Sequence, residues 1–102
     1  MLTVDDARRL ALSLPEAREQ DHHGRPSFRI HDKIFATVPD NEHVNVMVDA
    51  HDALGTIAID PEAFAELWWG GSLRGLSVTL ALAPPDILAD VLLKAWTRRS
   101  GP

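Results

Sequence analysis

The sequence predicts an α+β fold, a two-layer sandwich in which N- and C-terminal helices cover one face of an antiparallel sheet of about five to six strands. Three observations lead to this prediction. Apolar residues recur at helical spacing near both ends of the chain. Residues 27–48 contain three short runs of β-branched and aromatic residues, separated by turn residues. Residues 76–82 alternate in the manner of a strand that is buried on one face.

Length and composition are those of one folded domain, predicted to span residues 1–102. With 102 residues, of which 45% are apolar, the chain is long enough to bury a core. The absence of cysteine excludes disulfide bonds, thiolate metal sites and cysteine nucleophiles. No apolar run reaches membrane-spanning length, so we expect a cytoplasmic protein with no membrane partner. The net charge of −5 disfavours strong electrostatic binding of nucleic acid, although it is compatible with a local basic patch.

A first amphipathic helix is predicted to begin after Thr3, because threonine is a favourable N-cap residue. Apolar residues then recur at helical spacing as far as Leu14, and Pro15 ends the run. Residues 16–23 are the most polar segment and show no apolar periodicity, so they form either an exposed edge strand or a loop. We favour the edge strand, because the glycine and proline that follow mark a joint with the next strand.

The central part of the sheet is predicted to be three consecutive antiparallel strands. These strands are residues 27–30, 34–38 and 44–48. A three-residue loop at residues 31–33 sets Ile30 opposite Ile34 and makes one face of the three strands wholly apolar. A two-residue turn of His31 and Asp32 would instead place Arg29 opposite Ile34, so we reject it.

The segment after these strands is expected to contain a turn, a short strand and a helix. Residues 50–55 form a connecting turn or one helical turn, and residues 56–59 form the short strand. Asp60 then precedes a proline at a first helical position, which predicts a helix of about two turns as far as Trp68. The glycines at 70–71 are interpreted as the C-terminal end of that helix.

The last strand is predicted at residues 76–82, and the final helix begins at Pro84. Arg98 and Arg99 lie at the end of this helix, where cations complement the helix dipole. The tryptophans differ in their expected environment. Trp68 and Trp96 are at helical core positions, whereas Trp69 is expected to be partly exposed at a surface used by a partner.

Candidate catalytic and metal sites are not supported by the spacing of the residues. No serine lies in a nucleophile-elbow context and no pair of carboxylates stands out, so we expect no enzyme activity and no cofactor. The five histidines invite a metal hypothesis. However, His22 and His23 would point to opposite sides of a strand, and no histidine pair has the four-residue spacing of a helical zinc site. Solvated loop histidines are therefore the preferred interpretation, and we predict no metal site.

The outer face of the predicted sheet is the one candidate binding surface. Arg25, Arg29 and Lys33 would line up there beside Phe35. Basic residues interleaved with an aromatic ring suit a stacking surface for nucleic acid. The same residues suit a protein partner or a homodimer face, since arginine and aromatic residues are enriched at interface cores. A third interpretation is a cation–π pair of Arg29 with Phe35 that only stabilises the sheet.

Four segments resemble a known family. They are "LSLPEA" at residues 12–17, "HGRPSFRI" at 23–30, "KIFATV" at 33–38 and "ALAPPDILADVLLKAW" at 81–96. The chain is similar over nearly its whole length to the MmcQ/YjbR family of small bacterial proteins. Members often carry glycine immediately before the lysine of the third segment, where this chain has Asp32.

The resemblance implies a frataxin/CyaY-like α/β sandwich and raises DNA binding to the leading function, since members are commonly labelled DNA-binding proteins. The predicted contacts are Arg25, Arg29, Lys33 and Phe35, with Arg29 and Lys33 on phosphate and Phe35 stacking or packing. A protein-interaction or homodimer module that uses the same face is the alternative. Weak iron binding by acidic residues near the first helix follows only from analogy with the frataxin fold.

Overall fold

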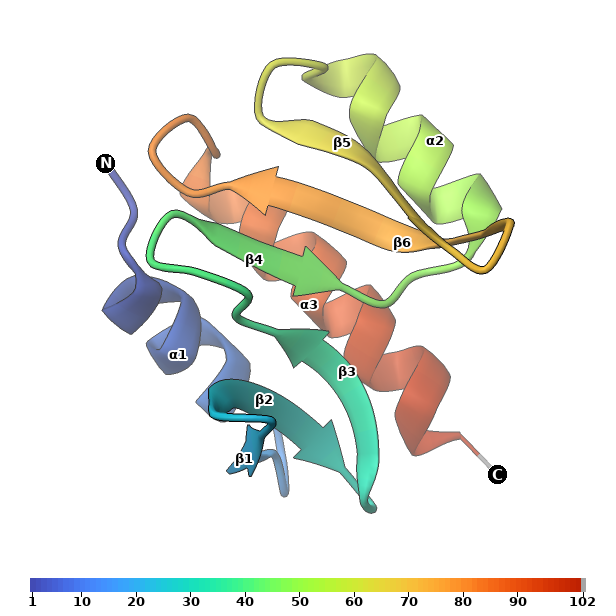
Figure 1. Ribbon diagram of the computed structural model, residues 1–102. Coiled ribbons are helices and arrows are strands. Elements are labelled where there is room, and N and C mark those ends of the chain that lie inside the picture. Colours follow the sequence, from blue (N-terminus) through green and yellow to red (C-terminus); the bar gives the residue numbers. More distant parts are fainter. Residues whose placement is uncertain (102) are drawn as a thin grey trace.

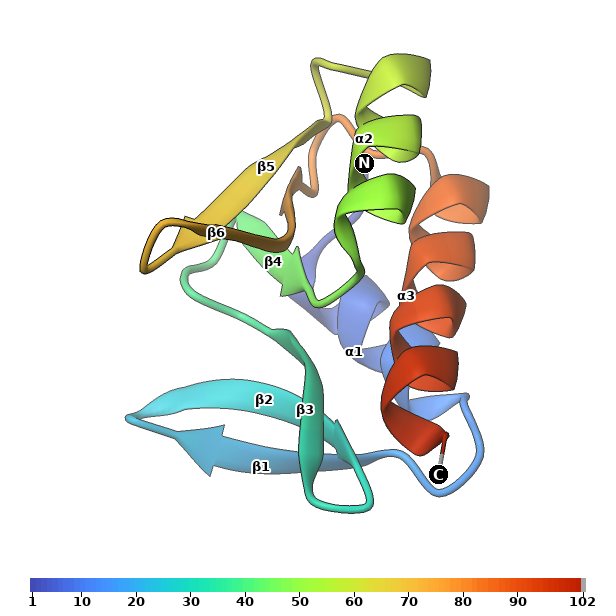
Figure 2. The ribbon, with the colours of Figure 1, turned by 90° about the vertical axis from the view of Figure 1, so that its right-hand side faces the viewer.

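A six-stranded antiparallel sheet forms one layer of the protein, and three helices cover one face of it (Figures 1 and 2). The computed structural model describes residues 1–101. The helices are α1 (Val4–Leu12), α2 (Ala50–Ile59) and α3 (Pro85–Ser100). The strands are β1 (Arg18–His22), β2 (Arg25–Ile30), β3 (Lys33–Thr37), β4 (His43–Val46), β5 (Phe64–Trp69) and β6 (Ser72–Thr79). Their order in the sheet is β1-β2-β3-β4-β6-β5. The predicted α+β sandwich is confirmed, including the edge strand β1.

The first helix begins as its sequence predicts. The Thr3 hydroxyl accepts a hydrogen bond from the Asp6 amide at 3.3 Å, and the Asp6 carboxylate accepts one from the Thr3 amide at 2.8 Å. This capping box satisfies two backbone donors that would otherwise lack partners. Beyond the other end, the Trp96 indole Nε1 donates to the Pro15 carbonyl at 3.0 Å and joins the turn that follows α1 to α3.

The turn between β2 and β3 differs from the prediction. His31 and Asp32 both have positive φ, 51° and 63°, and Ile30 pairs with Lys33 across them, which is the two-residue turn that the sequence analysis rejected. A bulge corrects the register further along, because Arg29 pairs with Ile34 whereas the preceding β2 residue, Phe28, pairs with Ala36. One β3 residue, Phe35, is therefore left over between these pairs.

The bulge exchanges the positions of two apolar side chains. Phe35 turns into the core, where it is fully buried, and Ile34 turns to the outer face. The prediction that Phe35 lies on the outer face is therefore wrong. The alternation of side chains along a strand holds only while the pairing stays in register, and an extra residue inverts it.

The region between β4 and β6 is also different from the prediction. Asp49 caps α2 by accepting from the Asp52 amide at 2.8 Å, so residues 50–59 are one helix and the predicted strand at residues 56–59 does not form. The predicted helix up to Trp68 is strand β5 instead. Gly70 and Gly71, with φ of 56° and 79°, form a tight hairpin turn between β5 and β6 rather than the end of a helix.

The core lies between the sheet and the helices. Strand β6 begins and ends earlier in the chain than the strand predicted at residues 76–82. Leu82 therefore lies beyond the end of β6, where it is exposed. Fully buried side chains come from both layers, including Phe28 and Leu76 from the sheet and Leu88 and Leu92 from α3. Within residues 1–101, no helix is both long and apolar enough to cross a membrane.

Candidate nucleic-acid interface

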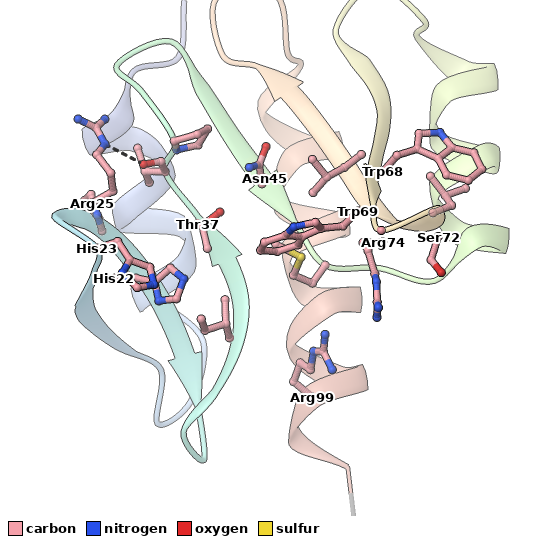
Figure 3. A pocket seen from close by; sticks show the side chains of 18 of the residues that line it. His22, His23, Arg25, Thr37, Asn45, Trp68, Trp69, Ser72, Arg74 and Arg99 are labelled. Atoms are coloured by element: carbon pink, nitrogen blue, oxygen red, sulfur yellow. Dashed lines mark hydrogen bonds between the residues drawn. The ribbon is translucent and has the colours of Figure 1, made fainter.

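A groove of about 870 Å³ lies on the sheet face opposite the helices. Figure 2 shows that β1 and β2, at one end of the sheet, and β5 and β6, at the other, extend to the same side of β3. The two ends of the sheet form the walls of the groove, and residues of β3 and β4 line its centre. Figure 3 shows the lining side chains.

The groove is basic although the chain is acidic. Its charged lining residues are four arginines, Arg25, Arg74, Arg98 and Arg99, joined by the imidazoles of His22 and His23. Among residues 1–101, no aspartate or glutamate lines this groove. The chain as a whole has 15 acidic and 10 basic residues, so the acidic residues lie elsewhere on the molecule.

Two of these arginines reach the groove from α3, on the other side of the sheet. β3 pairs with β4 through Ala36 with Val46 and Thr37 with Asn45, and the Met47 amide also donates to the Phe35 carbonyl at 2.9 Å. Beyond these pairs the last turn of α3 contributes to the groove (Figure 3). The Arg98 guanidinium donates to the Met47 carbonyl at 3.5 Å, which is the outer limit of a hydrogen bond.

Arg99 is partly buried where it lines the groove. Its Nε is buried and has no hydrogen-bond partner among the residues that the structure describes. Burial lowers the pKa of Arg99, and the neighbouring charges of Arg98 and Arg74 lower it further. The guanidinium remains charged, since arginine does not lose its proton in proteins. Three like charges are thus gathered at one end of α3.

Arg74 enters the groove because of a second bulge. On β5, Leu67 pairs with Gly75 and Trp68 pairs with Leu73, so Arg74 is the extra residue of β6. Such an irregularity bends the strand and changes the direction of its side chains. The bulge is therefore the backbone feature that aims Arg74 toward the arginines of α3.

The wall formed by β5 carries two exposed tryptophans. Trp69 is 65% exposed and Trp68 is 57% exposed. Both residues line the groove. Figure 3 shows the Trp69 indole pointing from β5 across the groove toward β3, whereas the Trp68 indole points the opposite way. The exposure of Trp69 agrees with the prediction for that residue. The predicted core position of Trp68 is wrong, because Trp68 is on an edge strand and not on a helix.

The four predicted contact residues are not brought together. Arg25 lines the groove, where its Nε donates to the Val38 carbonyl at 3.1 Å. Arg29 lines a separate hollow of about 420 Å³ that also contains carboxylates. Lys33 is exposed at the β2–β3 turn, outside the groove. Phe35 is buried in the core, so it is not available for stacking and does not lie under Arg29.

The arginines on the far side of the groove are not indicated by the sequence pattern. The positions of Arg98 and Arg99 predict only an interaction with the helix dipole, and no motif marks Arg74. One usable signal was the glycine pair after Trp69, since two glycines between strand-forming residues predict a hairpin. A hairpin there places Trp69 and Arg74 on the same structural unit.

The histidines do not converge on a metal site. His22 and His23 contact each other at the groove, with ring centroids 4.5 Å apart. Within the described part of the chain, no three histidine, aspartate or glutamate side chains are grouped so that they could hold a metal ion.

Comparison with known proteins assigns the family. A model of the family described as YjbR matches residues 12–98. The chain belongs to the YjbR family. The crystal structure of Deinococcus radiodurans protein DR2400, with a DUF419 domain, is similar with a TM-score of 0.77. The match covers 94% of this chain and 77% of that chain at 21% sequence identity, so it shows the shared fold alone. No curated protein matches the chain.

The segment that matches the YjbR family contains most of the groove. Arg25, Trp69, Arg74 and Arg98 lie within residues 12–98, whereas Arg99 follows them directly. The groove is therefore built mainly from the part of the chain that defines its YjbR membership.

Proposed function

We propose that this YjbR-family protein binds single-stranded DNA in the groove, without catalysing a reaction. One observation supports this proposal above the others. The groove combines four arginines with an exposed tryptophan, and no acidic residue lines it within residues 1–101, in a chain of net charge −5. Such a segregation of charge creates a positive field that is confined to one face.

The exposed indole favours single-stranded over duplex DNA. A single strand can place the face of an unpaired base on Trp69, a contact worth about 1–3 kcal/mol for a base in known complexes. In a duplex the bases are already stacked on each other and only their edges are accessible. The arginines would bind the phosphates on either side of the stacked base, since guanidinium groups match phosphate oxygens in geometry.

DNA binding is also the function predicted from the sequence, but the proposed site differs from the predicted one. The contacts predicted from the sequence are Arg25, Arg29, Lys33 and Phe35, and of these only Arg25 lines the groove. The other phosphate contacts in the proposal are Arg74, Arg98 and Arg99. Four of the chain's ten lysines and arginines thus lie in this groove.

The test is fluorescence anisotropy of a labelled single strand and a labelled duplex, titrated with the protein at several salt concentrations. Saturable binding of the single strand should weaken with salt, with a log–log slope of about −0.7 for each phosphate contact. Arg74→Gln and Arg99→Gln should each weaken binding and reduce this slope. Lys94→Gln removes the same charge from α3, at a residue that lines a different hollow, and should leave both unchanged.

A lack of saturable binding at low salt would contradict the proposal, because electrostatic affinity is greatest there. Tighter binding of the duplex than of the single strand would contradict the stacking role of Trp69. The predicted alternative, a protein-interaction or homodimer module, would be favoured by a dimer mass in light scattering where the monomer is 11.2 kDa.

A further inference from the structure

We infer that Arg74, Arg98 and Arg99 form a phosphomonoester site, and that Trp69 stacks on the base attached to that phosphate. The ligand is a nucleoside monophosphate, either free or as the phosphorylated end of a strand. This inference rests on the proposed function, because it names the part of a strand that the groove recognises. It goes further in predicting a preference for an end over the interior of a strand.

The charge of the three-arginine cluster favours a phosphomonoester. Arg74 comes from β6 and the other two from α3, and their charges are close enough to lower the pKa of Arg99. None of the ion pairs within residues 1–101 involves any of the three. A phosphodiester brings one negative charge, whereas a phosphomonoester brings nearly two at neutral pH. A cluster of three uncompensated cations therefore favours the monoester.

The cluster also has unused hydrogen-bond donors. Arg99 has a buried Nε without a partner in the described residues, and Arg98 has one long bond to the Met47 carbonyl. A buried donor without a partner costs free energy that an acceptor would recover. A terminal phosphate offers three free oxygens for this purpose, whereas an internal phosphate offers two. The three guanidinium groups can each donate two bonds to a phosphate.

The Trp69 ring is held in a fixed relation to the arginine cluster. Trp69 and Arg74 belong to the same hairpin, in which Trp69 pairs with Ser72 across the two-glycine turn. In Figure 3 the Trp69 indole lies across the groove and Arg99 and Arg74 lie on one side of it. A nucleotide has the same arrangement, with a planar base joined through a sugar to its phosphate.

The first experiment titrates the tryptophan fluorescence of the intact protein with adenosine 5′-monophosphate, adenosine and inorganic phosphate. We expect saturable quenching by the monophosphate and binding of adenosine that is weaker by about tenfold or more, since each charge-assisted hydrogen bond lost costs at least that factor. Arg99→Gln should weaken the binding of the monophosphate by a similar factor and leave the binding of adenosine unchanged. Lys94→Gln should change neither, and Trp69→Phe should remove the quenching.

The second experiment separates a free nucleotide from the end of a strand. Internally labelled strands of one sequence carry a 5′-phosphate, a 3′-phosphate or two hydroxyl ends, and a hydroxyl-ended strand one nucleotide longer controls for the added charge. We expect one of the phosphorylated ends to bind about fivefold or more tightly than this control, because the monoester brings about one more charge.

The outcomes of the two experiments distinguish the inference from the proposed function. Strands that bind equally whatever their ends, together with a monophosphate that binds no better than adenosine, would overturn the phosphomonoester site and leave single-strand binding intact. A monophosphate that binds through Arg99 while no strand binds would overturn single-strand binding and support the site for a free nucleotide. Absence of binding in both experiments would overturn both.

Discussion

Gly75 of β6 lies directly against the backbone of Val46 in β4. A β-carbon on residue 75 would be 3.0 Å from the Val46 carbonyl carbon, closer still to its oxygen, and 3.2 Å from the Met47 α-carbon. All three contacts are backbone atoms, which cannot rotate away as a side chain can. The close approach lies beside Met47 in the centre of the groove and beside the bulged Arg74.

The substitution Gly75→Ala should therefore destabilise the fold, because β6 and β4 would have to separate. We expect a loss of about 2–3 kcal/mol, the upper range for overpacking a buried site. Chemical denaturation monitored by circular dichroism measures it. Gly55→Ala is the matched control, since Gly55 lies in α2 and its added β-carbon would meet nothing within 4 Å.

The Gly55→Ala control should stabilise the protein. Alanine is favoured over glycine inside a helix by about 1 kcal/mol. A Gly75→Ala protein as stable as the unmodified chain would contradict the close approach of the two strands.

We predict that the Phe35 side chain contributes to the stability of the fold and not to the binding of DNA. Phe35→Ala should cost about 3–5 kcal/mol, as is usual when a buried phenylalanine is truncated. Phe35→Leu preserves most of the apolar volume, so the protein should stay folded and bind single-stranded DNA as the unmodified chain does. Denaturation and anisotropy measure the two effects. If the Phe35→Leu protein is folded but binds single-stranded DNA clearly more weakly, Phe35 takes part in binding.

The difference between prediction and structure at Phe35 has a physical cause. The sequence predicts the fold class, the two terminal helices and the strands of the first hairpin, because apolar periodicity and capping residues are local signals. A bulge depends on how two strands pair, and pairing is not a local property. Phe28 and Ala36 face each other as expected, yet the extra residue between that pair and the turn reverses the predicted outer face.

Residues 50–69 show a different limit of sequence interpretation. Asp49 and Asp60 are both acceptable helix caps, so either can begin a helix. The structure uses Asp49 for α2, and Asp60 ends that helix and accepts the Ala63 amide at 3.2 Å in the turn that follows. The candidate site is affected too, because Arg74 and Trp69 approach the arginines of α3 only through tertiary structure.

The two neighbouring tryptophans should differ in their effect on binding. Trp69→Ala removes the ring that lies across the groove and should weaken single-strand binding by about 1–3 kcal/mol, the range for a lost stacking contact. Trp68→Ala removes a ring of similar exposure that also lines the groove but extends away from β3 in Figure 3, so its effect should be smaller. Anisotropy titrations with both variants test this. Equal losses would contradict a specific stacking role for the Trp69 ring.

The β2–β3 turn offers a route to higher stability. Asp32 has a φ of 63°, a conformation that glycine adopts at lower cost than any other residue. Glycine is also a preferred residue in two-residue hairpin turns with positive φ, so Asp32→Gly should raise the free energy of unfolding by about 0.5 kcal/mol. Lys33→Gly, one position further into β3, should lower it, because glycine weakens a strand. Thermal denaturation compares the two variants with the unmodified protein. A lower stability of the Asp32→Gly protein would contradict the turn geometry.

The capping box at the N-terminus should make stability depend on pH. The Thr3 amide holds the pKa of Asp6 below its usual 3.8, with help from the Thr3 hydroxyl and from Arg9. A lowered pKa means that the folded state favours the carboxylate, so this stabilisation is present above the unfolded-state pKa. It is lost as the pH falls through the lower folded-state value.

Asp6→Asn keeps an oxygen acceptor but removes the charge, so it isolates this effect. Its melting temperature should lie below that of the unmodified protein at pH 7, and the difference should shrink as the pH falls below about 4. Glu62→Gln, at an exposed carboxylate in the turn between α2 and β5, is the matched control and should show little difference at either pH. A difference for Asp6→Asn that stays constant from neutral to acidic pH would show that its carboxylate charge does not stabilise the first turn of α1.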